Sequence, residues 1–175
     1  MSGPVIQPAR GKLPPEKLRV LETCQYIHKH AEEFYQFLAV SHHEHREIAR
    51  MWSLFAIDKC NHSDSFKMVS RLKGEGISGI NLTAESATNI LIKMKSIPKG
   101  DVRNPLSVVD ALRFTVQMEE RLKDVHFSRV VEFFHEQDTA LMASSIQSNS
   151  SILHKMTEEY LNLTVMEESF TPPFV

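Results

Sequence analysis

Two long segments in the N-terminal half of the chain carry apolar residues at steps of three and four positions. The segments cover residues 16–40 and 46–73. This spacing places the apolar side chains on one face of an α-helix, and a long helix of this kind needs partners that cover that face. The stripe of the first segment consists of Val20, Cys24, Ile27, Ala31, Phe34 and Leu38. The two segments therefore predict long helices that pack against other helices.

Two further helices are predicted in the C-terminal half, over residues 105–134 and 139–163. Asn104 and Pro105 form a favourable helix start, because asparagine is a good cap and proline suits the first helical position. No segment alternates apolar and polar residues between turn signals. The sequence therefore predicts an all-α fold without a β-sheet.

The lengths of the connections predict how these helices are arranged. Short connections make the first and second helices antiparallel neighbours, and likewise the third and fourth. About thirty residues separate the second helix from the third. They include a short predicted helix that begins after the cap residue Thr83 and ends before Pro98. Such a long link is typical of a four-helix bundle with one crossover.

The composition argues against several classes of protein. The length of 175 residues is typical of one domain, which we expect over residues 16–163, with an irregular segment at 1–15 and a C-terminal tail at 164–175. We expect the stretch MEESFTPPFV in this tail to be irregular. A net charge of −2 without a basic run argues against nucleic-acid binding. No apolar run approaches the ~18 residues of a membrane span, and the proline-rich start does not resemble a signal peptide. We therefore expect a cytoplasmic protein without a membrane partner, whose two cysteines are reduced.

Four stretches of the sequence carry a resemblance to a known superfamily. They are HAEEFYQFLA, LFAIDKCNHSDSF, ALRFTVQMEERLKDVHF and SILH, one in each long predicted helix. With them the chain resembles the ferritin-like superfamily, nearest to its rubrerythrin-type branch, over residues 18–163. The resemblance implies a homodimer of antiparallel four-helix bundles, each with one long crossover between the second and third helices. It also implies two irons, bound by a Glu from each of the first and third helices and a Glu-x-x-His from each of the other two.

The expected ligand positions can be located in this sequence through an internal repeat. In many members of the superfamily the single Glu lies seven residues before an aromatic residue, and Tyr35 and Phe127 are suitable aromatics here. A single offset of 92 residues then relates four pairs of positions, as an internal two-fold repeat would. These pairs are His28 and Glu120, Tyr35 and Phe127, Lys59 and Ser151, and His62 and His154.

The ligand set that the resemblance implies is incomplete in this chain. The ligands present at the expected positions are His62, Glu120 and His154. His28 replaces one Glu and is still able to bind a metal. Lys59 and Ser151 replace the two Glu that would bridge a metal pair. Because a protonated lysine has charge of the same sign as the metal, an intact di-iron centre is not expected.

Two interpretations of this site remain open, and the sequence does not decide whether the protein is an enzyme. In the first, one iron or zinc ion is bound in a metal carrier or a weak oxidase. The ligands of that ion would be His28, His62, Glu120 and His154. In the second, Lys59 forms an ion pair with Glu120 in the old metal cavity and no metal binds. The bundle then acts as a partner-binding or scaffolding protein.

The apolar spacing also predicts which of these side chains face the core. Lys59 falls on the apolar stripe of the second helix. Glu120 falls in line with Phe127, whereas Glu119 points off that line. His154 lies at the edge of the apolar line of the fourth helix. The sequence therefore predicts a core contact between Lys59 and Glu120.

Overall fold

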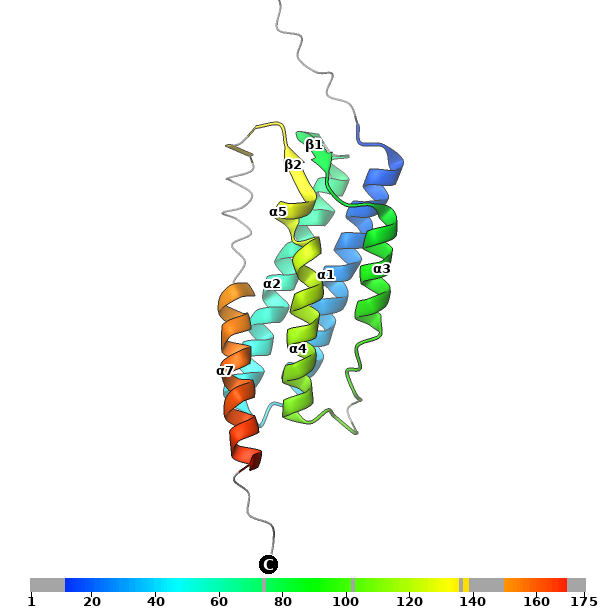
Figure 1. The fold of residues 1–175 in the computed structure, drawn as a ribbon. Coiled ribbons are helices and arrows are strands. Elements are labelled where there is room, and N and C mark those ends of the chain that lie inside the picture. The colour runs from blue at the N-terminus through cyan, green and yellow to red at the C-terminus, as the bar shows by residue number, and fades with distance from the viewer. Residues whose placement is uncertain (1–11, 74, 102, 136, 139–149, 170–175) are drawn as a thin grey trace, which may run out of the picture.

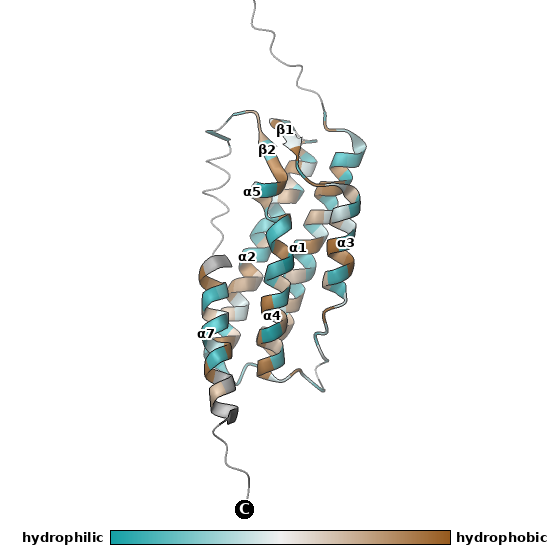
Figure 2. Cartoon of the chain, in the orientation of Figure 1, coloured by the Kyte–Doolittle hydropathy of each residue, from teal (hydrophilic) through white to brown (hydrophobic). Residues whose placement is uncertain are grey.

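The computed structural model describes residues 12–73, 75–101, 103–135, 137–138 and 150–169. In this part the chain is mostly helical, and its long helices lie side by side with a small sheet near one end (Figure 1). Polar and apolar residues alternate around each helix (Figure 2), and the buried apolar side chains meet in one core. No helix in this part is long and apolar enough to span a membrane.

Helix α1 (Pro15–Ser41) and helix α2 (Arg46–Arg71) are antiparallel neighbours (Figure 1). The predicted apolar stripe of α1 is buried along its whole length, because its residues recur about once per turn on one face. The backbone N–H of Leu13 donates a hydrogen bond of 3.2 Å to the carbonyl of Lys73. This bond ties the start of α1 to the end of α2. Helix α2 runs without a break, as predicted.

The link between α2 and α4 contains the predicted short helix, α3 (Ala84–Lys95). Thr83 caps α3 as predicted, since its side chain accepts a hydrogen bond from a backbone N–H of the first turn. Helix α3 packs along α1 and leads the chain back to the end of the molecule where α4 (Val108–Leu122) begins (Figure 1). The cap of α4 is Ser107 rather than the predicted Asn104.

The predicted continuous helix over residues 105–134 is wrong, because α4 ends at Leu122. His126 has extended backbone angles, φ −62° and ψ 135°, which no α-helix accommodates. Around it the chain forms a 3-10 turn, a short helix and a strand. These elements are η1 (Lys123–Val125), α5 (Phe127–Val130) and β2 (Val131–Phe133).

Strand β2 pairs antiparallel with β1 (Ile77–Ile80), so the prediction of a fold without a sheet is also wrong. Val131 is buried, Glu132 is exposed and Phe133 is partly buried. This alternation suits a strand, but three residues are too few to reveal it in the sequence. Val131 pairs with Ile80, and both β-branched side chains are buried, which favours extended backbone at this position.

Helix α7 (Ser150–Ser169) packs against α4 and α2. The hydroxyl of Tyr160 donates a hydrogen bond of 3.2 Å to Glu47 near the start of α2. The first part of the predicted fourth helix, residues 139–149, lies outside the described residues. Because α7 extends to Ser169, the prediction that residues 166–175 are irregular is wrong up to that point.

Large side chains fill the core between α1, α2 and α4. Trp52, Phe55 and Phe66 of α2 and Tyr35 of α1 are wholly buried. The indole N–H of Trp52 donates a hydrogen bond of 2.8 Å to the hydroxyl of Thr115 on α4. This bond satisfies the one polar group of the indole, so the ring is buried without an unpaired donor.

Candidate functional site

Lys59 lies in the core as predicted, with 3% of its side chain exposed. Its Nζ atom lies 2.9 Å from Oε2 of Glu119 on α4 and 2.9 Å from Oδ2 of Asp58 on α2. Both carboxylates are buried as well. Three charged groups therefore form one ion cluster inside the protein, and this cluster is the centre of the candidate site.

The predicted partner of Lys59, Glu120, is wrong by one position. The side chain of Glu119 is 3% exposed, whereas that of Glu120 is 65% exposed and accepts a hydrogen bond from Lys123. The prediction drew the inner line of the helix through Phe127. Because α4 ends before Phe127, that residue does not continue the stripe, and the inner face of α4 passes through Glu119 instead.

Tyr35 extends the cluster from the side of α1. Its hydroxyl donates a hydrogen bond of 2.7 Å to Oε1 of Glu119, and its ring stacks on Phe55 with 4.9 Å between the ring centroids. Each oxygen of the Glu119 carboxylate thus has a donor of its own, the phenol on one and Lys59 on the other. The sequence predicted Tyr35 as the aromatic residue that follows an expected ligand position, and not as a hydrogen-bond donor.

Burial acts in opposite directions on the pKa values of Lys59 and Tyr35. Burial alone would lower the pKa of Lys59, but the charges of Glu119 and Asp58 and their hydrogen bonds outweigh it, and the pKa lies above its usual value. Burial, followed by the nearby charge of Glu119, raises the pKa of Tyr35 well above its usual value. Lys59 is therefore a cation at neutral pH, and Tyr35 keeps the proton that it donates.

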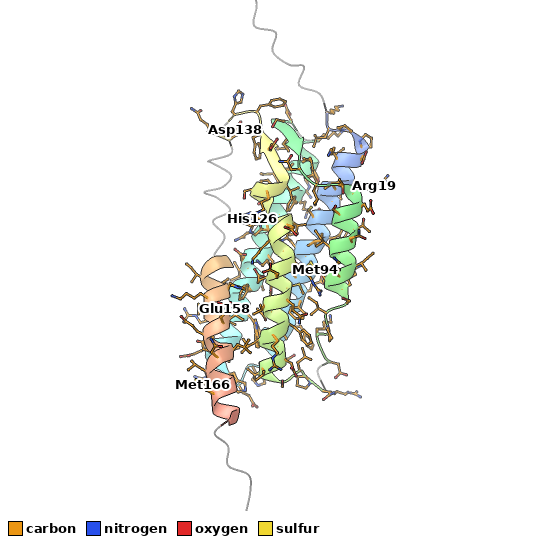
Figure 3. All side chains as sticks on the ribbon, in the orientation of Figure 1. Arg19, Met94, His126, Asp138, Glu158 and Met166 are labelled. Carbon is orange, nitrogen blue, oxygen red and sulfur yellow. The ribbon has the colours of Figure 1, made fainter. Side chains whose placement is uncertain are left out.

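A row of three histidines lies next to the ion cluster. The rings of His28 and His62 stack with 4.9 Å between centroids and an angle of 12° between planes. The ring of His126 meets that of His62 edge-on, at 4.6 Å. Figure 3 labels His126, which lies where α4 gives way to α5. His126 was not predicted as a site residue, because the sequence pattern placed it inside a continuous helix.

His28 also accounts for the break after α4. Its Nε2–H donates a hydrogen bond of 3.0 Å to the carbonyl of Val125, the last residue of η1. A carbonyl at the end of a helical segment lacks its usual intrahelical donor, so the bond from α1 satisfies a group that the break would otherwise leave unpaired. This bond also fixes the proton of His28 on Nε2. The Nδ1 atoms of His28 and His62 are buried without a hydrogen-bond partner.

Burial lowers the pKa of all three histidines. For His28 burial is followed by the nearness of His62, and the pKa lies well below its usual value. Burial lowers the pKa of His62 to about 4, although the carboxylate of Asp58 acts in the opposite direction. Burial and the charge of Lys59 lower the pKa of His126. The row is therefore neutral at pH 7.

Of the remaining predicted site residues, His154 does not join this cluster. His154 on α7 has 27% of its side chain exposed, and its Nε2 atom lies 3.4 Å from a carboxylate oxygen of Glu158. This partial exposure agrees with the prediction that His154 lies at the edge of the apolar face of its helix. Ser151 lies in the first turn of α7, and its side chain is outside what the structure describes.

The arrangement does not fit the metal sites that the resemblance implies. A metal bound by an imidazole lies near the plane of its ring, and the two stacked, nearly parallel planes of His28 and His62 share no such position. Glu120 faces solvent, and the Lys59 ammonium binds the buried carboxylates. Within the described residues, no group of three or more His, Cys, Asp or Glu side chains is placed to hold a metal ion.

A cavity of about 140 Å³ lies beside the ion cluster. The row of histidines, Lys59 and Glu119 line it. Its other lining residues come from the region where α4 ends and are Leu122, Lys123 and Arg129. The break in the helix thus places two cationic residues at a cavity that a continuous helix would not have formed in this way.

Comparison with protein families, with curated proteins and with solved structures gives no match for this chain. The resemblance to the ferritin-like superfamily therefore stays a prediction from the sequence.

Proposed function

We propose that the chain is a ferritin-like four-helix bundle in which a buried lysine takes the place of the metal centre, and that it works as a metal-independent binding protein. The four helices would be α1, α2, α4 and α7, and the long crossover would be the link with β1 and α3. The observation that carries the proposal is the position of Lys59 between the buried carboxylates of Glu119 and Asp58.

Electrostatics support this interpretation of Lys59. Buried carboxylates need a positive partner, because an uncompensated charge in a protein interior is very unfavourable. In a di-iron protein the metal ions provide that charge, whereas here the ammonium group does so at hydrogen-bond distance. A divalent cation in the same place would meet the like charge of Lys59 and would have to displace it from both acids. The proposal therefore favours binding over iron chemistry.

Metal loading tests the proposal directly. Protein purified without a tag is incubated with Fe²⁺ or Zn²⁺, dialysed and examined by elemental analysis. We expect that the residues of the core bind no metal ion. One ion per chain that is lost in a His62→Ala variant would contradict the proposal and favour the site with a single metal.

A matched variant separates the core from the surface. His43 is exposed on the connection between α1 and α2, in a stretch that also contains His42 and His45. An ion that remains in His62→Ala but is lost in His43→Ala is bound at the surface, and this result leaves the proposal standing. Both variants are compared by circular dichroism, so that a loss of folding is not taken for a loss of metal.

A further inference from the structure

We propose that the cavity beside Lys59 binds a small oxyanion, a ligand with a carboxylate or phosphate group. This inference rests on the proposed function, since it takes Lys59 as a permanent cation of the site. Three cationic residues line the cavity: Lys59 in the core, and Lys123 and Arg129 near the end of α4. Glu119 is the acidic residue among those that line the cavity in the described part of the chain.

The charged side chains that line the cavity favour an anion. Three of them are cations, Lys59, Lys123 and Arg129, and one is an acid, Glu119. The other acids that pair with these cations do not line the cavity; they are Asp58, Glu120 and Asp124. An anion in the cavity would therefore lie against more cationic than acidic side chains.

The two outer cations are available to a ligand. Lys123 is paired with Glu120, and Arg129 lies 3.7 Å from Asp124. These side chains are all more than half exposed. Exposed ion pairs of this kind are weak, so a ligand that offers a better acceptor can compete for the cations. The guanidinium group of Arg129 also suits the two oxygens of a carboxylate or phosphate, which it can bind with two parallel hydrogen bonds.

The core supplies a donor at the inner side of the cavity. A lysine ammonium has three N–H donors, and the described residues provide two acceptors for Lys59, on Asp58 and Glu119. The third N–H is left for a ligand in the cavity that Lys59 lines. The ligand would then contact both Lys59, which is fixed in the core, and Arg129, which is exposed.

The size of the cavity suits a small ligand. Its volume of about 140 Å³ is enough for phosphate or a short carboxylate. Leu122 contributes an apolar side chain to the lining, which suits the carbon end of a short carboxylate.

Calorimetric titration of the full chain tests the inference. Sodium phosphate and sodium acetate are titrated separately at constant ionic strength into the parent and into an Arg129→Gln variant. We expect one saturable site for at least one of the two anions. Because a charge-assisted hydrogen bond contributes about 1.5–3 kcal/mol, we expect Arg129→Gln to weaken binding about ten-fold or more. The anion that binds identifies the ligand group as phosphate or carboxylate.

A second arginine provides the control. Arg113 on α4 is also exposed and forms a surface ion pair with Asp110, but it does not line the cavity. We expect Arg113→Gln to bind the anion as the parent does. The absence of saturable binding of both anions, or equal weakening by Arg129→Gln and Arg113→Gln, overturns the inference. The metal-loading experiment is independent, so a protein that binds neither metal nor anion contradicts this inference and leaves the proposed function standing.

Discussion

The Nζ atom of Lys59 lies 2.9 Å from Oε2 of Glu119, and each side chain is 3% exposed. The two residues are 60 positions apart in the chain, and their contact joins α2 to α4. A buried pair of this kind gives little stability relative to a well-packed apolar pair, but the loss of one partner is costly because the other charge stays buried. The pair is therefore a sensitive position for mutation.

Removal of the buried cation should destabilise the protein strongly. A Lys59→Ala variant leaves Glu119 and Asp58 without their shared partner, so we expect a loss of about 3–5 kcal/mol in the free energy of unfolding. Urea denaturation followed by circular dichroism measures this loss. Lys155 on α7 has 78% of its side chain exposed, and Lys155→Ala should stay close to the parent. Equal stability of the two variants would show that Lys59 is an ordinary surface lysine.

A glutamate at position 59 should make the stability of the protein depend on bound metal. Lys59→Glu restores a Glu-x-x-His element with His62 and places a third carboxylate beside Glu119 and Asp58. We expect the variant to unfold at a lower temperature than the parent. Added Zn²⁺ should raise its Tm, because a metal that binds only the folded state stabilises it by mass action. Thermal melts with and without metal measure both effects, and a variant that melts like the parent and ignores Zn²⁺ contradicts the argument.

Two adjacent glutamates should respond very differently to loss of charge. Glu119→Gln removes the acceptor charge that Lys59 and Tyr35 share, so we expect a loss of several kcal/mol in the free energy of unfolding. Glu120→Gln changes an exposed residue and should stay within about 0.5 kcal/mol of the parent. Chemical denaturation of both variants provides the comparison. If Glu120→Gln were the less stable variant, Glu120 would be the buried partner of Lys59, as the sequence predicted.

The hydroxyl of Tyr35 should contribute measurably to stability. Tyr35→Phe removes the hydrogen bond to Glu119 and keeps the ring that stacks on Phe55. We expect a loss of about 1.5–3 kcal/mol, the usual range for a hydrogen bond to a charged group. Tyr26 on α1 is 67% exposed, and Tyr26→Phe is the matched control. If both variants unfold at the parent's urea concentration, the phenol does not hold Glu119.

The row of histidines should make the protein sensitive to acid. Burial lowers the pKa of His62 from 6.5 to about 4, so between these values the unfolded chain binds a proton that the folded chain does not. The contribution of His62 is therefore fully present above pH 6.5 and is lost as the pH falls from 6.5 toward about 4. Each such proton changes the free energy of unfolding by about 1.4 kcal/mol per pH unit. Denaturation at pH 7, 6 and 5 measures the slope.

A variant identifies the source of that slope. His62→Phe keeps an aromatic ring in the stack and removes the titrating group, so the slope between pH 6 and 5 should become smaller. His43→Gln, at an exposed position, should leave the slope unchanged. The same slope in both variants would assign the acid sensitivity to other groups.

The parts of the fold that the sequence predicted correctly are those that local patterns determine. The stripe of α1 repeats through many turns, and Thr83 supplies a capping oxygen within its own segment. The inward position of Lys59 followed from the same periodicity. These predictions needed no knowledge of distant contacts.

The errors in the length of the third predicted helix, in the missing strand and in the partner of Lys59 arise at the end of α4, where distant contacts decide the structure. Val131 pairs with Ile80, and His28 donates to the carbonyl of Val125, so residues far away in the sequence favour the break. The apolar spacing of this region also fits a helix, and periodicity alone cannot distinguish the two for so short a stretch. Once the helix was extended too far, Glu120 replaced Glu119 in the predicted pair, and His126 was missed.

Asp58 was missed for a different reason. It precedes Lys59 directly, and neighbouring residues on a helix point about 100° apart, so the stripe that contains Lys59 does not include it. The signal that could have found it is the spacing of four residues to His62, which places both side chains on one side of α2.

A hydrogen bond between Asn81 and Val130 connects the link between α2 and α4 to the segment that carries Arg129. The backbone N–H of Asn81, directly after β1, donates a hydrogen bond of 2.8 Å to the carbonyl of Val130, and Arg129 is the preceding residue. Arg129 is thus held on one side by the turn at His126 and on the other by a strand that belongs to the link. A substitution that loosens β1 would therefore shift a cation at the cavity without touching any residue that lines it.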